Sequence, residues 1–222
     1  TINIIPGTDG DIETADIFKG LIRNIEYRSN ADEAYDTSSL SSIRCSIGFI
    51  FVDHGYVSND GFEQELKIKR SVNPLQCWID CDSIEADGSD ARRGVKIQPV
   101  SVSEFKRRYP KAEVSSFGEE KSKNYKDEDS VNLAEYFEIV EESKDVGLND
   151  LGQMEEVIEC TEYSSTRTLK KTKVMRYILS GKEELAKSTF PGKYIPIIPV
   201  YGEEAWIDGK RQLYSLIRKS KD

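Results

Sequence analysis

The stretch PGKYIPIIPVYGEEAWIDGKRQLYSLIRKSKD, residues 191–222, constrains the fold more than any other part of the sequence. Pro196 and Pro199 interrupt its apolar half, residues 194–201. Because proline has no amide hydrogen and clashes inside a helix, this half is predicted to be extended, as an edge strand or outside any sheet. Asp208-Gly209 predicts a two-residue hairpin turn between two further strands. The stretch ends on a charged run that does not resemble a natural carboxyl terminus, so we expect a longer parent protein.

A helix is predicted near the beginning of the chain, over residues 11–47. Its first turn is acidic, which the helix dipole favours, with Asp11, Glu13 and Asp16. Four apolar residues at helical spacing form one stripe: Phe18, Leu21, Ile22 and Ile25. The serine-rich run 37–42 lowers helix propensity, so we expect a break or kink there, and Gly48 is the expected end.

Mostly antiparallel strands are predicted after this helix. The apolar or alternating runs cover residues 47–52, 65–69, 76–80, 94–100, 131–141, 154–163, 168–179 and 194–201. A loop over 143–152 and a turn at 164–166 suggest that 154–163 pairs with 168–179. Ser101 and Glu104 form a capping box, and Pro110 ends the short helix 103–109.

These elements predict an α+β fold, with a long amino-terminal helix followed by antiparallel strands and hairpins. We expect a single domain over residues 1–222. The charged stretch 118–130 is the best position for an internal boundary.

The chain is acidic, with 31 Lys and Arg against 40 Asp and Glu and a formal charge of −9. This balance argues against a protein that grips DNA over its whole surface, because phosphate contacts dominate nucleic-acid affinity. It is compatible with a channel past which DNA slides. We expect no secretory leader, and no apolar run approaches the ~20 residues of a membrane span. The sequence therefore predicts a cytosolic protein.

The four cysteines favour free thiols over a metal or disulfide framework. Cys77 and Cys81 are close in sequence, whereas Cys45 and Cys160 are isolated and His54 is the only histidine. A structural zinc site usually needs two close pairs, or a pair and histidines. We therefore expect buried free thiols and no disulfide.

Catalytic chemistry has two candidates in the sequence. His54 follows Asp53 at the end of an apolar strand and could act as a general base, although a histidine there is more often a surface residue. The second candidate is an acidic set that could hold calcium or magnesium: Asp80, Asp82, Glu85, Asp87 and Asp90. Its spacing does not fit an EF-hand, and Asp87-Gly88-Ser89-Asp90 is more simply a turn. A metal-dependent hydrolase using this loop is the alternative function, and a generic β-rich interaction module is a third.

Three basic clusters stand out. They are Lys106-Arg107-Arg108, then Lys170-Lys171 with Lys173 and Arg176, and finally Lys210-Arg211. Each could contact phosphates or a neighbouring acidic subunit, and the simpler interpretation is a solvated face. Trp78 and Trp206 are expected to be core or interface anchors rather than base-stacking platforms.

Five stretches, in order along the chain, resemble one protein family. They are ADIFKGLIRNIEYRSNADEAYDT (15–37), FEQELKIKRSVNP (62–74), EADGSDAR (85–92), EFKRRYPKA (104–112) and PGKYIPIIPVYGEEAWIDGKR (191–211). Together they are similar to the bacteriophage portal proteins, or head-to-tail connectors, of the short-tailed phage type. Residues 38–57 and 118–189 match least well.

The resemblance implies a structural subunit without catalytic residues or cofactors, encoded by a phage or prophage. Portal subunits form a ring, usually dodecameric, at one capsid vertex of the virion after assembly in the bacterial cytoplasm. The ring contacts capsid, scaffolding, terminase and tail proteins and passes double-stranded DNA without reading its sequence. The matching stretches lie in the wing region of the amino-terminal half.

Subunits in a ring meet head to tail, so charged faces of opposite sign would fix their register. The residues we expect at such faces, or at phosphates, are Lys106, Arg107, Arg108, Asp87, Asp90, Arg92, Lys210 and Arg211.

Overall fold

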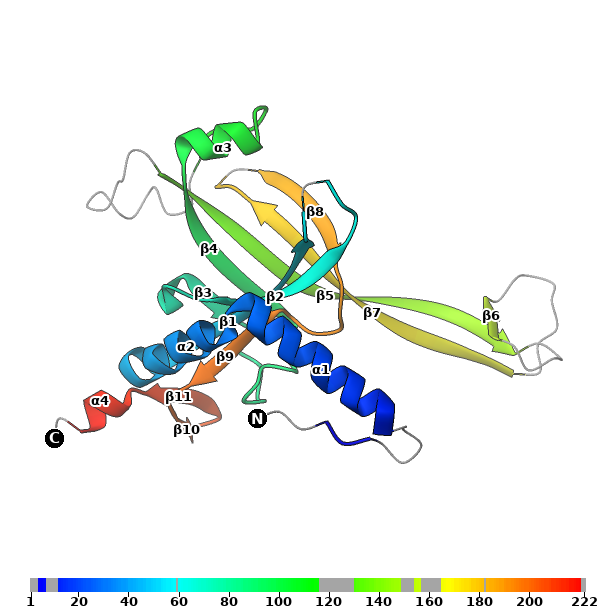
Figure 1. The fold of residues 1–222 in the computed structure, drawn as a ribbon, viewed down its shortest axis with the longest axis horizontal. Coiled ribbons are helices and arrows are strands. Elements are labelled where there is room, and N and C mark those ends of the chain that lie inside the picture. Colours follow the sequence, from blue (N-terminus) through cyan, green and yellow to red (C-terminus); the bar gives the residue numbers. More distant parts are fainter. Residues whose placement is uncertain are drawn as a thin grey trace. The chain divides into compact units, whose positions relative to one another are not determined.

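The computed structural model describes residues 4–6, 12–58, 60–115, 130–148, 154–156, 165–181 and 183–220. The chain divides into two compact units, one comprising Thr1–Ile79, Ser83–Ser89 and Pro196–Asp222, the other Asp80–Asp82 and Asp90–Ile195. Helices and antiparallel sheets make up both (Figure 1), which confirms the α+β class. The predicted boundary loop 118–130 lies outside the described residues except for Ser130.

The first unit begins with two helices, α1 (Ile12–Ser29) and α2 (Ala31–Cys45), where one helix was predicted. Asn30 separates them in the left-handed conformation (φ 49°), which asparagine tolerates better than most residues. Ser46, also left-handed (φ 70°), ends α2 two residues before the expected Gly48. The predicted break in the serine-rich run was therefore wrong, because that run is the regular C-terminal half of α2.

The serines belong to the face of α2 that packs closely on the sheet. The buried positions of this helix are all small: Ala31, Ala34, Ser38 and Ser42. The Ser38 and Ser42 hydroxyls donate to the carbonyls of Tyr35 (2.9 Å) and Ser39 (2.8 Å) one turn earlier, which satisfies them inside the interface. Small buried side chains allow close approach, and this tertiary advantage outweighs the low helix propensity of serine.

A three-stranded antiparallel sheet, ordered β2-β1-β9, lies against these helices. It consists of β1 (Ile47–Tyr56), β2 (Gln64–Arg70) and β9 (Ile197–Tyr201). Pro199 lies opposite Phe49 on the edge strand β9, as the two prolines predicted. Phe49, Phe51 and Ile197 are buried and form the apolar centre of this unit.

Short elements complete the first unit. Asn73 caps the 3₁₀ turn η1 (Pro74–Gln76), and β3 (Cys77–Ile79) follows. The predicted Asp208-Gly209 hairpin is confirmed: it joins β10 (Glu203–Ile207) to β11 (Lys210–Tyr214), and both turn residues have positive φ, 52° and 71°. The last helix is α4 (Leu216–Lys219).

The second unit is an antiparallel sheet in the order β4-β5-β7-β8, with a short helix over one face. Its elements are β4 (Arg93–Ser101), α3 (Val102–Arg108), β5 (Ser130–Leu148), β7 (Ser165–Leu179) and β8 (Glu184–Phe190). Side chains of alternate residues on one sheet face form its core: Val131, Leu133, Phe137, Val174 and Phe190. Phe105 of α3 packs on Val131 and Leu133.

The partner of β7 differs from the prediction. β7 pairs with β5 from Leu148↔Ser165 to Ala134↔Leu179, so the predicted pairing of 154–163 with 168–179 was wrong. The predicted loop over 143–152 was also wrong as far as residue 148, because β5 continues to Leu148. β6 (Met154–Glu156) pairs with the end of β5 instead, and residues 157–163 lie outside the described chain.

The apolar stripe of α1 is only partly covered. Ile22 and Ile25 are half-buried, whereas Phe18 and Leu21 remain 53% and 50% exposed. Among the described residues, no helix has both the length and the apolarity needed to cross a membrane.

Candidate functional site

The first basic cluster lies on the outer side of α3. Ser101 caps this helix by accepting a hydrogen bond from the Glu104 amide (3.3 Å), as the capping box predicted. The fully buried Phe105 anchors the helix and leaves the three cations exposed. Glu104 pairs with Arg107 (2.8 Å) and Arg108 (2.6 Å), so one carboxylate fixes two of these cations.

These contacts make Glu104 more acidic than an ordinary glutamate. Side-chain hydrogen bonds from Arg107, and then from Arg108, hold the pKa of Glu104 below its usual value. Because the folded pKa is depressed, the contribution to stability is present above the unfolded pKa and is lost as the pH falls through the folded pKa.

We predict that changing Arg107 and Arg108 to glutamine raises the pKa of Glu104 toward its usual value. A carbon-13 NMR titration of the Glu104 carboxyl measures this directly. Lys106→Gln, on the same helix, is the matched control and should leave the pKa unchanged, because Lys106 does not contribute to the shift. An equal pKa in the double variant and the parent would contradict the ion-paired geometry.

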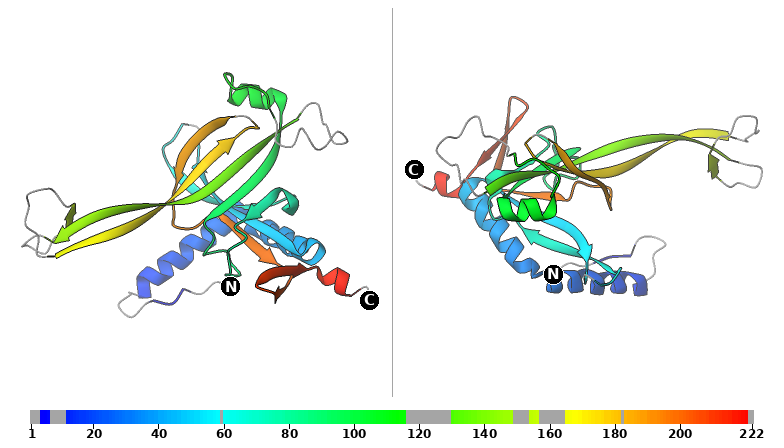
Figure 2. Two further views of the ribbon diagram at one scale, coloured as in Figure 1. Left: turned by 180° about the vertical axis from the view of Figure 1, so that it is seen from behind. Right: turned by 90° about the horizontal axis from the view of Figure 1, so that it is seen from above.

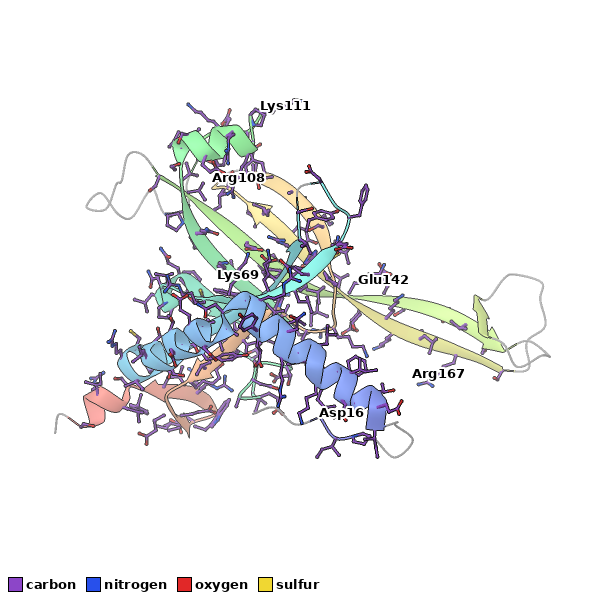
Figure 3. All side chains as sticks on the ribbon, viewed as in Figure 1. Asp16, Lys69, Arg108, Lys111, Glu142 and Arg167 are labelled. Atoms are coloured by element: carbon purple, nitrogen blue, oxygen red, sulfur yellow. The ribbon has the colours of Figure 1, made fainter. Side chains whose placement is uncertain are left out.

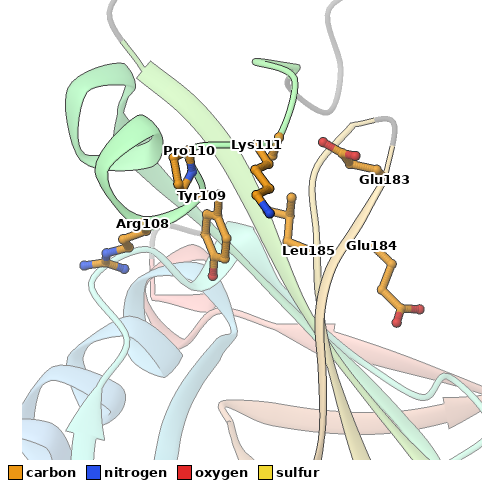
Figure 4. A pocket seen from close by; sticks show the side chains of 8 residues that line it. Arg108, Tyr109, Pro110, Lys111, Glu183, Glu184 and Leu185 are labelled. Atoms are coloured by element: carbon orange, nitrogen blue, oxygen red, sulfur yellow. The ribbon is translucent and has the colours of Figure 1, made fainter.

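A surface hollow of about 320 Å³ lies beside α3, between its C-terminal end and the beginning of β8 (Figure 4). Arg108, Tyr109, Pro110, Lys111 and Ala112 line it from one side, and Glu183, Glu184 and Leu185 from the other. Glu183 accepts a hydrogen bond from the Glu113 amide (2.8 Å), which fixes one wall.

The third basic cluster consists of one exposed residue and one largely buried residue. Lys210 is exposed, whereas the Arg211 side chain is only 12% exposed. The Arg211 guanidinium lies 4.4 Å from the ring centre of Tyr201 and 5.2 Å from that of Trp206, and it also pairs with Glu204 at 3.5 Å. Such cation–π contacts are strongest where water is excluded.

Arg211 also forms hydrogen bonds to the segment 83–89, the part of the acidic stretch that belongs to its own unit. Its Nη2 donates to the backbone carbonyls of Ile84 (2.7 Å) and Glu85 (3.4 Å). The planar fork of arginine can serve the carbonyls, rings and carboxylate at once, which a lysine cannot do. The structure thus uses Arg211 to position residues 83–89.

Replacing Arg211 with methionine is predicted to destabilise this unit by about 1.5–3 kcal/mol, the usual contribution of a hydrogen bond to a charged group. Arg211→Lys should recover only part of the loss. Urea unfolding followed by tryptophan fluorescence is suitable, since Trp206 contacts Arg211. Lys210→Met is the adjacent control and should change stability by less than about 0.5 kcal/mol. Equal effects of Arg211→Met and Lys210→Met would contradict the positioning role.

The acidic segment is a sequence of hydrogen-bonded turns. Asp80 accepts from the amides of Asp82 (3.3 Å) and Arg92 (3.2 Å), and Asp87 accepts from the Ser89 amide (3.0 Å). The predicted aspartate turn at Asp87 is confirmed. Asp90 is exposed.

Ligand atoms of Asp80, Cys81 and Asp82 lie within 4.8 Å of one another. They are exposed or half-buried, and the Asp80 carboxylate is already bonded to backbone amides. Exposed acidic groups of this kind are common in proteins without a bound ion, so a metal site here stays a prediction.

The remaining candidate residues are Asp53 with His54, Arg92 and the cysteines. The Asp53 carboxylate accepts from the His54 backbone amide (2.9 Å) and pairs with Lys69 (2.6 Å). Arg92 pairs with Glu141 across the sheet. Cys45, Cys77 and Cys81 are free thiols, but only Cys77 is buried, so the expected burial was wrong for the other two. Cys160 lies outside the described residues.

The second basic cluster belongs to the paired strands β5 and β7. Lys173 pairs with Glu142 (2.7 Å) and Arg176 with Glu135 (2.6 Å). Sequence reasoning treated residues 170–176 as one mixed group and did not include Arg167. The strand register places Lys170 and Arg176 on one face of β7 and Arg167, Lys171 and Lys173 on the other, because alternate residues of a strand point to opposite faces.

Comparison with known proteins identifies the class. The profile of the family described as Phage P22-like portal protein matches residues 1–222, the whole chain. The chain therefore belongs to the phage P22-like portal protein family, a family of structural proteins, which confirms the resemblance found in the sequence.

A curated relative agrees with this membership. It is described as "Portal protein" of Acyrthosiphon pisum secondary endosymbiont phage 1 and is 29% identical over 173 residues, covering 65% of this chain. The match covers 23% of the relative, so the chain corresponds to less than a quarter of its length. These matches give no support to a metal-dependent hydrolase or to a generic interaction module.

Proposed function

We propose that the chain is the wing region of a portal subunit, which assembles with copies of itself into a ring through which phage DNA is packaged and ejected. The observation that carries the proposal is the family match over residues 1–222. The ring is proposed to be dodecameric, to contact capsid, scaffolding, terminase and tail proteins, and to surround double-stranded DNA. Its location is the portal vertex of the virion, after assembly in the cytoplasm of a bacterial host.

The subunit is proposed to act by contact rather than by catalysis, with no cofactor or metal. Its acidic balance, 40 acidic against 31 basic residues, is compatible with passage of DNA without sticking, because like charges repel phosphates. Residues 1–222 are proposed to act as one wing region. Lys106, Arg107, Arg108, Arg92 and Lys210 supply cationic contact surface, and Asp87 and Asp90 supply anionic surface, while Arg211 acts indirectly by holding the acidic loop.

Negative-stain electron microscopy of the protein at its full natural length tests this proposal. Rings with a central hole and near twelve-fold symmetry are expected. Compact monomers or small closed oligomers would overturn it. The full-length protein is needed, because parts outside these 222 residues also contribute to subunit contact in the proposed assembly.

A further inference from the structure

β5 and β7 extend beyond the rest of their sheet as a two-stranded ribbon. β4 pairs with β5 only as far as Glu138, and β8 pairs with β7 only from Val174 onward. In the described chain, residues 140–148 of β5 and 165–173 of β7 therefore have each other as strand partners, apart from β6 at the tip. We call this ribbon the β-arm. Its nine paired β7 residues correspond to about 30 Å, and Figures 1 and 2 show it leaving the sheet of its unit.

The β-arm has one basic face. The register places Arg167, Lys171 and Lys173 on the same side, with Glu142 as their acidic neighbour (Figure 3 labels Arg167 and Glu142). Three partly exposed aliphatic residues lie between these charges: Val140, Val146 and Leu169. The aliphatic groups offer apolar surface that a partner can bury, and the cations offer charge that can set the register of a protein contact.

The opposite face of the β-arm differs. It carries Lys170 with hydroxyl residues and two carboxylates, and Asp145 accepts a hydrogen bond from Thr168 (2.7 Å). Lysines that only prevent aggregation at strand edges are not expected to concentrate on one face, so the asymmetry indicates a contact surface. An isolated two-stranded ribbon is also marginally stable in water, so a long one gains stability when a partner covers it.

A segment of the opposite sign lies elsewhere in the same chain. Residues 71–91 contain five acidic residues and no Lys or Arg. Asp82, Glu85, Asp87 and Asp90 are exposed, and Asp80 is half-buried. Hydrogen bonds from backbone amides orient the carboxylates of Asp80 and Asp87.

We propose that the basic face of the β-arm docks on the acidic segment 80–90 of a second copy of this chain. The proposal rests on the proposed ring-forming function and names the surfaces that meet. Two different patches then meet between neighbouring copies, which is a head-to-tail interface, and such an interface forms a ring where the rotation between copies closes. Glu142 would remain paired with Lys173 at the rim, where an exposed pair costs little.

A second copy is a better partner than nucleic acid on these observations. The β-arm contains five Lys or Arg but also three Asp or Glu, and Glu142 already neutralises part of the charge of its basic face. Phosphate binding needs many uncompensated cations. Docking on one exposed acidic segment of opposite sign needs only a few cations.

A charge swap in the full-length protein tests the pairing. Arg167→Glu with Lys171→Glu is expected to abolish rings in electron microscopy and mass photometry at physiological salt. Asp82→Lys with Glu85→Lys should do the same. The four changes combined should restore rings, because each altered surface again meets its opposite charge. Rescue of this kind is expected only if the two surfaces contact each other.

Lys170→Glu is the matched control within the β-arm. It places a carboxylate on the opposite face, diagonally between Glu141 and Asp145, and leaves the basic face intact. Rings are expected to persist. Circular dichroism of each variant checks that the fold is retained.

The outcomes separate the two proposals. If the parent protein forms no rings, the proposed function fails. If the parent forms rings and both surface variants do so equally well, or if the combined variant is not rescued, the docking proposal alone is overturned. Intact rings of the arm variant that no longer retain duplex DNA in a gel-shift assay would also overturn it, in favour of a nucleic-acid contact.

Discussion

Gly48→Ala is expected to destabilise the first unit by about 3 kcal/mol, at the upper end of the usual cost of overpacking. A Cβ at this position would lie 2.1 Å from the Ser38 carbonyl oxygen and 2.9 Å from its Cα. These are backbone atoms of α2, and they cannot move aside as the end of a flexible side chain could. The helix must shift from β1, which would separate the small buried face of α2 from the sheet.

Tryptophan fluorescence during urea unfolding measures this loss. Both tryptophans of the chain, Trp78 and Trp206, belong to the first unit. Gly55→Ala is the matched control, because it makes the same change in the same strand with nothing within 4 Å of the new Cβ. Similar unfolding midpoints for the two variants would mean that α2 does not approach β1 as closely as described.

The sequence was most informative where the controlling interaction is local. The Ser101 cap of α3, the Asp208-Gly209 turn and the proline-marked edge strand all depend on neighbouring residues. Each was predicted correctly because its chemistry is complete within a few positions. The class of fold followed from these elements.

Pairing between distant strands was not accessible in the same way. β7 could pair with the nearest strand-like run or with β5, and no local signal separates these possibilities. The choice depends on which pairing buries Val174 against Phe137 and Phe190. Such contacts join residues far apart in sequence, and they exist only once the sheet has formed.

The same limit explains the candidate site. Sequence clusters group charges by adjacency, so Lys170 and Lys171 were considered together. In the strand they face opposite sides, and Arg167 joins Lys171 and Lys173 instead. The alternation of Arg167, Leu169, Lys171 and Lys173 was a period-two signal that could have revealed the basic face. The inserted position of Arg211 had no such signal, because it depends on rings and carbonyls from three separate segments.

Phe105→Ala is expected to destabilise the second unit by about 3–5 kcal/mol, the usual range for a buried phenylalanine. Phe105 is 0% exposed and is the residue through which α3 packs on Val131 and Leu133. Its ring also lies 5.7 Å from that of Tyr109, at the hollow beside the helix. The truncation leaves a cavity between α3 and the sheet, because Phe105 is the buried residue of this short helix.

The loss should be visible at the basic cluster as well as in stability. Once α3 detaches, hydrogen exchange at the Tyr109 amide, which donates to the Phe105 carbonyl (2.8 Å), should rise to the rate of an unstructured segment. Phe105→Leu should lose only part of the stability, because leucine fills most of the space. Phe62→Ala is the matched control, since Phe62 is 94% exposed and should change stability by less than about 0.5 kcal/mol. Unchanged protection at Tyr109 in Phe105→Ala would mean that contacts other than Phe105 hold the basic cluster on the sheet.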